Sequence, residues 1–339
     1  MQNKKEYSPV GSLILAAAAT IWGFAFTAQK AAADHLEPFS VNSIRFFIGG
    51  FFLLLFSEIQ TCIRIRRNPS YVPPRFTPTD WIAASVCGGL LFLASTLQQY
   101  GIDEGDAGTA AFLTALYIVF VPVLGALLFR RPTGRFVWGG IVLALFGAYL
   151  LSVIGGSPAA DEVHGLSGLF SLFGSTGFKI GRASVFILLC SVVFSFQILS
   201  IDHFSGSVSG VRLAMLEFFV AGTLGLPEML ILERPSFDTV VPALPPLLFL
   251  GIFSCGIAYT CQIVGQAKTP PAVAAVIMSL ESVFGAVGSV FLLGERMNLA
   301  EVLGCLFIFL AVLAVEIPTA LSERRKSQPP PSGEEIRDP

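Results

Sequence analysis

Ten stretches of about 20 mostly apolar residues run along the chain, and they constrain its fold more than any other feature of the sequence. A helix of this length crosses the core of a bilayer, because it satisfies all of its backbone hydrogen bonds within the segment. Hydrophobic residues make up 54% of the chain and charged residues 13%, against roughly 25% charged residues in soluble domains. We therefore predict an all-α integral membrane protein. Its ten expected helices are Gly11–Ala31, Phe39–Glu58, Trp81–Gly101, Ala107–Phe129, Phe136–Ile154, Arg182–Ile201, Val208–Ile231, Leu244–Gly265, Pro271–Leu293 and Leu299–Pro318.

The composition argues against several classes of function. The formal net charge of −2 offers no basic surface for a phosphate backbone, so we expect no nucleic-acid partner. No spacing of His and Cys suits a metal, so we expect no metal site, no cofactor and no disulfide framework. Catalytic groupings and a Walker-type phosphate loop are also missing, which predicts neither an enzyme nor an ATP-driven pump. The histidines and cysteines of the chain are His35, His164, His203, Cys62, Cys87, Cys190, Cys255, Cys261 and Cys305.

The first apolar stretch has a second interpretation as a cleaved signal peptide, because it follows Lys4 and Lys5 and ends in a run of alanines. The apolar part of a signal peptide has only about 7–15 residues. The stretch in this chain is longer and has a counterpart in the second half, so we favour a transmembrane helix.

The Lys and Arg residues of the loops predict the orientation of the chain in the membrane. Fourteen of them fall on the side of the N-terminus and five on the opposite side. We therefore expect a multi-pass protein of the inner (cytoplasmic) membrane with both termini in the cytoplasm. The cytoplasmic set is Lys4, Lys5, Arg64, Arg66, Arg67, Arg75, Arg130, Arg131, Arg135, Lys268, Arg324, Arg325, Lys326 and Arg337, and the opposite set is Lys30, Lys179, Arg182, Arg234 and Arg296.

The two halves of the chain match each other. At a shift of 164 residues, Leu93–Phe129 aligns without a gap on a stretch that ends at Leu293. Gln98 then falls on Gln262, a match that apolar composition alone does not readily produce. The match indicates an internal duplication.

The duplication predicts the domain organisation. Residues 1–155 and 182–319 form two repeats of five helices, joined by an external linker at 156–181 and followed by a disordered cytoplasmic tail at 320–339. Because five is odd, the second repeat enters the membrane from the opposite side. Such inverted repeats are common in secondary transporters, which bind substrate near the midplane between the two copies.

Four motifs resemble those of a known family. They are "AAAATIWGFAFTAQKAA", "SIRFFIGGFFLLLF", "TALYIVFVPVLGALLFRRPTGRFVWGG" and "SLESVFGAVGSVFLLGERMNLAEVLGCLFIFLAVL". Over Gly11–Pro318 the chain resembles the ten-helix, EamA-type branch of the drug/metabolite transporter superfamily. The resemblance implies export of amino acids or other metabolites. The chain departs from the family pattern at Ser282, where the family usually has proline, and at Arg131, which occupies the first-half position of Glu295.

Glu281 lies close to the middle of the ninth expected helix, and its counterpart in the first repeat is Tyr117. An ionisable group at this depth costs roughly 2.5–3.5 kcal/mol on insertion scales and usually faces a cavity or a partner. Glu281 could therefore exchange a proton during transport or bind a cationic group of the substrate. Alternatively, it is a hydrogen-bonded residue that fixes helix packing.

Amides and arginines are expected to form two polar layers, one on each side of the midplane. These layers could be the rims of an outward and an inward vestibule, or they could be hydrogen bonds between helices, with the arginines extending to the headgroups. Their members are Gln29, Arg45 and Gln98 in the outer third and Gln197, Arg212 and Gln262 in the inner third.

Aromatic residues complete the candidate substrate site. They could line a cavity for an amphipathic metabolite, or they could serve ordinary packing and lipid contact. The full set of candidate substrate-binding residues is Trp22, Phe26, Gln98, Tyr117, Tyr259, Gln262 and Glu281.

Glu217 follows Arg212 by five positions, which places the two about 140° apart around a helix. They therefore pair poorly with each other. We expect Glu217 to have a partner on another helix and a structural role.

Two features concern the shape and packing of single helices. Pro122 and Pro227 remove backbone hydrogen bonds and should kink their helices. Gly140, Ala144 and Ala148 form a small-residue ridge that permits close approach of another helix, either within the chain or in a homodimer.

These observations predict a secondary active transporter that moves a small metabolite across the cytoplasmic membrane by alternating access. A flippase for a lipid-linked or amphipathic substrate remains an alternative, which a lateral, lipid-open groove would distinguish from a closed central cavity. A membrane-embedded enzyme is the less favoured third class.

Overall fold

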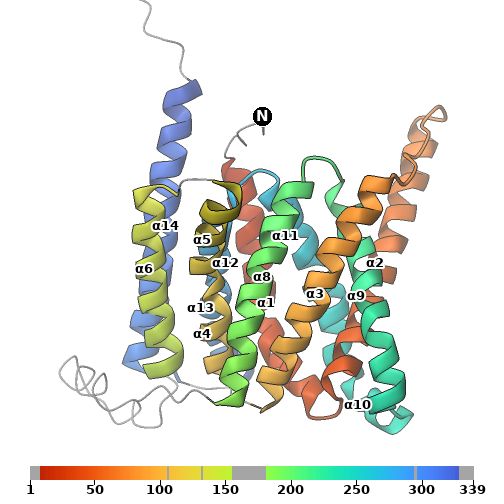
Figure 1. The fold of residues 1–339 in the computed structure, drawn as a ribbon, viewed down its shortest axis with the longest axis horizontal. Coiled ribbons are helices and arrows are strands. Elements are labelled where there is room, and N and C mark those ends of the chain that lie inside the picture. Colours follow the sequence, from red (N-terminus) through yellow and green to blue (C-terminus); the bar gives the residue numbers. More distant parts are fainter. Residues whose placement is uncertain (1–7, 105–106, 131–132, 155–180, 294–295, 328–339) are drawn as a thin grey trace, which may run out of the picture.

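The computed structural model describes residues 8–104, 107–130, 133–154, 181–293 and 296–327. Over these ranges all regular elements are helices, and ten helical stretches are long and apolar enough to cross a membrane. The predicted all-α membrane protein with ten transmembrane helices is therefore confirmed. Figure 1 shows the helices side by side in one bundle, with the start of α1 and the end of α14 at the same face.

The helices carry the labels of Figure 1, and η marks a π-helical segment. Their bounds are α1 Pro9–Ala33, α2 Pro38–Arg67, α3 Pro78–Glu104, α4 Ala107–Ala115, α5 Tyr117–Phe129, α6 Arg135–Tyr149, η1 Leu150–Ile154, α8 Arg182–Phe204, α9 Gly210–Glu228, η3 Met229–Glu233, α10 Phe237–Leu248, η4 Phe249–Tyr259, α11 Thr260–Gln266, α12 Pro271–Met278, α13 Leu280–Leu293 and α14 Leu299–Ser327.

Two helices extend well beyond their expected ends. α2 continues to Arg67 rather than Glu58, and α14 continues to Ser327 rather than Pro318. The expected ends mark where apolar residues give way to charged ones, but helical hydrogen bonds do not require apolar side chains. Residues 320–327 of the expected tail are therefore helical, while 328–339 and the linker at 156–180 lie outside the described residues.

Two of the ten spans are interrupted at matching places in the two halves. The interruptions fall at Leu116, between α4 and α5, and at Ser279, between α12 and α13. The Ser279 hydroxyl donates to a carbonyl oxygen one turn earlier, at 2.6 Å, and so competes with the helical hydrogen bonds. Pro122 lies within α5, six residues after the first interruption. The interruptions place Tyr117 and Glu281 in the first turns of α5 and α13.

The eighth span changes from α-helix to π-helix along its length. Three prolines lie within α10, and none of them has an N–H to donate to the preceding turn. The 11-residue π-helical segment η4 follows directly. Within η4 the carbonyl oxygen of Ser254 accepts a hydrogen bond from Trp22 Nε1 at 3.3 Å, and Tyr259 ends the segment.

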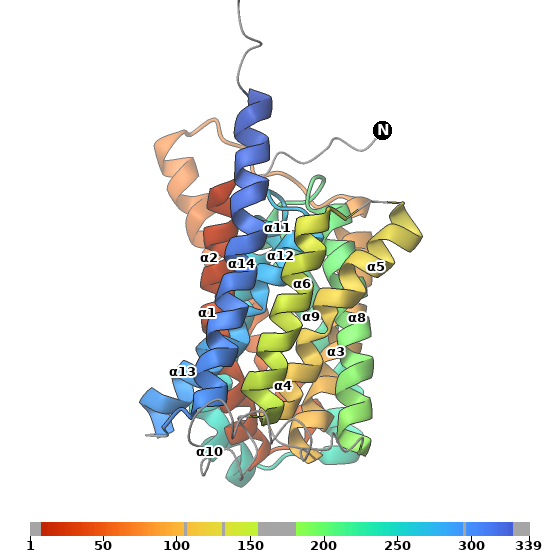
Figure 2. The same cartoon turned by 90° about the vertical axis from the view of Figure 1, so that its left-hand side faces the viewer.

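The predicted small-residue ridge of α6 packs within the chain. A Cβ added to Gly140 would clash with Val315 Cγ2 and lie 3.2 Å from the backbone oxygen of Ala311, both in α14. Ala144 and Ala148, on the same ridge, are fully buried. Figure 2 shows α6 and α14 running alongside each other, so α14 occupies the surface that could otherwise have served a homodimer.

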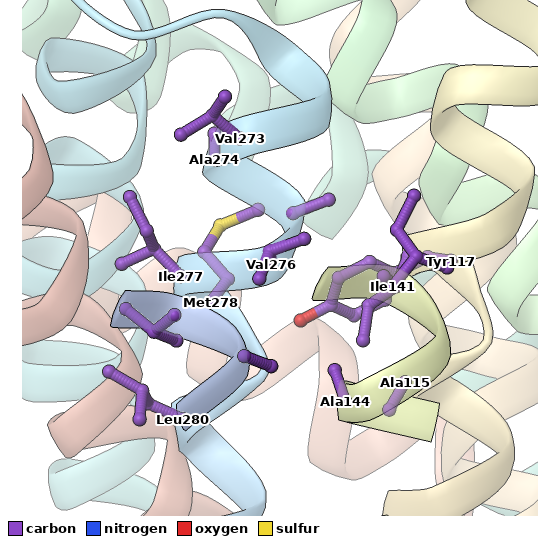
Figure 3. Packing of buried hydrophobic residues seen from close by; sticks show 14 of the residues in the cluster. Ala115, Tyr117, Ile141, Ala144, Val273, Ala274, Val276, Ile277, Met278 and Leu280 are labelled. Atoms are coloured by element: carbon purple, nitrogen blue, oxygen red, sulfur yellow. The ribbon is translucent and has the colours of Figure 1, made fainter. Parts of the chain in front are cut away.

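An apolar cluster joins the interrupted spans to the rest of the bundle. Val276, Ile277 and Met278 of α12 lie across from Tyr117 and Ile141 (Figure 3). In contrast, large apolar side chains such as Leu55, Leu127 and Val142 are exposed on the outside of the bundle, as expected of a surface that faces lipid.

Candidate functional site

A cavity lies among helices from both halves of the chain. All seven candidate substrate-binding residues line it, together with three residues of the predicted polar layers. These ten residues are Trp22, Phe26, Gln29, Arg45, Gln98, Tyr117, Gln197, Tyr259, Gln262 and Glu281.

Arg45 is the cation of the cavity. Its side chain is 4% exposed, and its Nη1 donates a hydrogen bond to Gln29 Oε1 at 3.0 Å. The backbone oxygen of Gln29 in turn accepts from Gln99 Nε2 at 3.3 Å. Arg45 therefore points into the bundle and does not extend to the headgroups. Its Nε has no hydrogen-bond partner among the described residues, which leaves a donor for a bound group.

Glu281 is the carboxyl group of the cavity. Tyr117 donates its hydroxyl hydrogen to Glu281 Oε1 at 3.2 Å, and both side chains are buried. The counterparts of the two repeats thus contact each other directly. A carboxylate has about four acceptor positions, so one hydrogen bond from a phenol leaves acceptor capacity for a cationic group. The geometry suits both a packing role and a binding role for Glu281.

The amide groups of the cavity are less well paired. Gln197 is fully buried, and neither its Oε1 nor its Nε2 has a hydrogen-bond partner in the described part of the chain. Gln262 Oε1 is in the same situation, whereas Gln98 Nε2 lies 3.5 Å from Thr114 Oγ1. Leaving a buried amide unpaired costs about 1–3 kcal/mol. A bound molecule with hydrogen-bonding groups would recover this cost.

Aromatic rings form part of the wall. Trp22 and Tyr259 meet edge to face, with ring centroids 4.9 Å apart. Phe26 and Phe194 add apolar surface to the lining. Such a wall suits the hydrocarbon part of a metabolite, while the charged and amide groups suit its polar part.

Arg212 does not reach the cavity, so the predicted inner layer is incomplete. Its guanidinium donates to the backbone oxygens of Pro74 and Arg75 at 2.8 and 3.1 Å. It also lies 3.4 Å from Asp80 Oδ2 and over the ring of Phe76. Because Arg212 is only the third residue of α9, it is near enough to the helix end to hold the connection between α2 and α3. The sequence comparison of the two halves could not detect this partner.

Among the described residues, the hydrogen-bond partner expected for Glu217 on another helix is not found. Glu217 is fully buried in α9, and neither carboxyl oxygen has a hydrogen-bond partner among the described residues. Apolar side chains of α2, α3 and α9 pack in this region.

Ser254 and Met278 line the cavity but were not among the sequence candidates. Ser254 reaches it through the π-helical register of η4, which an α-helical reading of the sequence misplaces. Met278 lies three residues before Glu281, a spacing that would have indicated a shared face, but an apolar residue gives no distinct signal in an apolar helix.

The arrangement is suited to binding rather than to covalent chemistry. The cavity combines one guanidinium, one carboxyl group, amides and aromatic rings. Over the described ranges, no group of three or more His, Cys, Asp or Glu residues could hold a metal ion.

Comparison with protein families shows to which family the chain belongs. The model of the EamA-like transporter family matches the chain twice, at residues 9–153 and 181–317. The chain belongs to the EamA-like transporter family. The predicted resemblance is thus confirmed, and this EamA protein is a multi-pass membrane transporter.

Individual relatives agree with the affiliation. An "uncharacterized transporter" of Archaeoglobus fulgidus is 29% identical over 314 residues, which cover 93% of the EamA protein and 87% of the relative. Another, of Clostridium kluyveri, is 23% identical over 285 residues and covers 84% of both chains. A solved crystal structure superposes with a TM-score of 0.69 at 15% identity, covering 94% of this chain and 99% of that one. This last likeness concerns the fold alone.

Proposed function

We propose that this EamA protein is a secondary active transporter that exports a small zwitterionic metabolite, an amino acid or a related compound, by alternating access. The observation that carries the proposal is that one cavity is lined by both the guanidinium of Arg45 and the carboxyl group of Glu281. A guanidinium complements a carboxylate, and a carboxyl group complements an ammonium group. The aromatic wall would hold the rest of the molecule.

The match of the two halves to each other, which we interpret as an inverted repeat, supports alternating access in this proposal. The family model matches each half separately, and the cavity takes Arg45 from the first half and Glu281 from the second. Interrupted helices at the substrate site are common in transporters of this kind. Rocking of one half against the other would then expose the cavity to each side in turn.

The location in the proposal is the cytoplasmic membrane, with both termini inside. The start of α1 and the end of α14 lie at one face of the bundle (Figure 2), and the Lys and Arg excess falls on that face. Reporter fusions after Ser327 and in the connection at 234–236 would test this orientation.

A flippase would require a groove that opens sideways to lipid. The cavity described above is lined by residues of α1, α2, α3, α4, α5, α8, η4, α11, α12 and α13, so it lies between the two halves of the chain. We therefore favour a small metabolite over a lipid-linked substrate.

Reconstitution in liposomes tests the proposed function. The purified protein would be placed in liposomes loaded with an equimolar mixture of the twenty protein amino acids, with and without an imposed pH gradient. Mass spectrometry of the external medium should show that some amino acids leave faster than from protein-free liposomes. If none does, and if a deletion strain exports metabolites normally, the proposal is wrong. A fluorescent phospholipid in parallel liposomes would reveal flippase activity.

A further inference from the structure

Glu217 is a buried carboxyl group that the proposed substrate site does not use. It lies in α9, which packs against α2 and α3, as Figure 1 also shows. Its exposed fraction is 0%, and no described residue gives either carboxyl oxygen a hydrogen bond. Glu281 differs in this respect, because Tyr117 donates a hydrogen bond to it.

The helices around Glu217 pack closely against each other in this conformation. A Cβ added to Gly88 of α3 would lie 2.7 Å from the backbone oxygen of Glu217. On the α2 side, the ring of Phe46 stacks on that of Phe218 with centroids 5.9 Å apart.

In the described part of the chain, no cation donates a hydrogen bond to the carboxyl group of Glu217. Glu217 is in electrostatic contact with Cys87 of α3 and with Cys255 and Tyr259 of η4. Arg45, the buried cation of α2, is also an electrostatic neighbour of Cys255 and Tyr259, but it donates its hydrogen bond to Gln29. A buried carboxylate ion with neither a hydrogen bond nor a counter-ion is energetically unfavourable, whereas the neutral acid is much less so.

Glu217 also lies next to a residue of the cavity wall, Tyr259. The ring of Phe218 meets the ring of Tyr259 edge to face, with centroids 5.5 Å apart. Tyr259 lines the cavity and is an electrostatic neighbour of Glu217. A molecule that binds against Tyr259 would therefore act on the packing around Glu217.

We propose that Glu217 is a proton-binding site that couples transport to proton movement across the membrane. The proposal rests on the proposed transport function. In the conformation described here the side chain holds its proton among packed helices. When the contacts of α9 with α2 and α3 open to one side, the acid releases the proton to water and becomes a carboxylate. It takes a proton from water on the other side before the helices close again, so one proton crosses per cycle and no other bond changes.

Carbodiimide labelling tests the proton-binding site without any substrate. Dicyclohexylcarbodiimide is apolar and reacts with a protonated carboxyl group, adding as a whole to form a stable N-acylurea. Peptide mass spectrometry of the purified full chain should find this adduct on Glu217, with less adduct as the pH is raised. An absence of adduct on Glu217, or labelling that does not depend on pH, would overturn the proposal.

Transport by variants tests the coupling, with the amino-acid mixture as the probe. Glu217→Gln should retain exchange of amino acids without a gradient within about twofold, but it should lose accumulation driven by a pH gradient at least tenfold. Glu217→Asp should retain part of the driven accumulation. Glu58→Gln, which removes an exposed carboxyl group from α2, should behave as the wild type in both assays.

The outcomes separate this proposal from the proposed function. If Glu217→Gln accumulates amino acids like the wild type, or loses exchange and accumulation together, Glu217 is not the coupling site. If the wild type itself moves no amino acid, the proposed function fails, while the labelling still decides whether Glu217 binds a proton. The labelling also decides the matter if Glu217→Gln does not fold.

Discussion

At the scale of single residues, the two arginines of the predicted polar layers have different surroundings. Arg45 lies in the cavity, and Arg212 holds the α2–α3 connection at the end of α9. We expect Arg45→Gln to weaken amino-acid transport by about 10- to 150-fold, because a hydrogen bond to a charged group contributes roughly 1.5–3 kcal/mol. Initial rates over a range of substrate concentrations would measure the change in kcat/KM.

Arg212→Gln is the matched control. It should lower the unfolding free energy by about 1 kcal/mol, since the interactions of Arg212 are only partly buried, and it should leave kcat/KM nearly unchanged. Thermal unfolding of both variants in detergent would complete the comparison. Equal transport losses in the two variants would contradict a binding role that is specific to Arg45.

A second residue-scale prediction concerns Glu281. If its carboxyl group binds the substrate ammonium, Glu281→Gln should remove the preference for an amino acid over its 2-hydroxy acid analogue. Tyr117→Phe removes only one hydrogen bond to the carboxyl group, so it should reduce transport by about five- to tenfold and keep the preference. Competition of each analogue pair in liposomes measures this preference. Normal folding and unchanged preference in Glu281→Gln would leave Glu281 with the packing role alone.

Much of the site could be predicted at this scale, because a polar residue inside an apolar helix is conspicuous. That signal identified Gln98, Gln262 and Glu281, which all line the cavity. It could not identify partners, because they come from distant parts of the chain. Arg212 was therefore assigned to the wrong surroundings, and Glu217 was given a partner that the described residues do not supply.

At the scale of helices, the contact between α6 and α14 depends on glycine. A Cβ at position 147 would lie 2.7 Å from the Gly304 backbone oxygen and 2.8 Å from the Ile308 backbone nitrogen, and neither can move without shifting α14. We expect Gly147→Ala to lower the unfolding free energy by about 1–3 kcal/mol, the usual cost of overpacking. Gly139→Ala, on the same helix, has no atom within 4 Å of the added Cβ and should not be destabilised. Similar unfolding midpoints for both variants would contradict this prediction.

The positions and number of the spans could be predicted at the helix scale, but their interruptions could not. Apolar length alone determines where a helix can cross the membrane. In contrast, the break at Ser279 depends on a side-chain hydrogen bond within one turn, and the first break falls at Leu116 rather than at Pro122. The π-helical register of η4 likewise follows the three prolines of α10, and the positions of these prolines in the sequence do not determine how the helix responds to them. These local departures position Tyr117 and Tyr259 at the cavity.

At the scale of the whole molecule, the two halves interlock rather than lie side by side. In α1, Gly11 packs on Gly265 of α11, and Gly23 packs on Gly285 of α13. Gly101 of α3 packs on Ile187 of α8 in the same way. These close approaches allow hardly any side chain between helices of different halves. Each half therefore needs the other half to cover much of its helix-packing surface and to complete one side of the cavity.

Such interlocking predicts how fragments of the chain should behave. Two fragments, residues 1–160 and 170–339, should purify together when they are co-expressed with an affinity tag on only one of them. Each fragment alone should be degraded or aggregate, because glycine surfaces made for another helix would face lipid without a partner. Co-expressed fragments should also restore amino-acid transport, since the cavity takes Arg45 from one fragment and Glu281 from the other. Pull-down and size-exclusion chromatography would measure the association, with Gly23→Leu as a control that should abolish it. A first fragment that is stable and monodisperse by itself would show that the contacts between the halves are not required for folding.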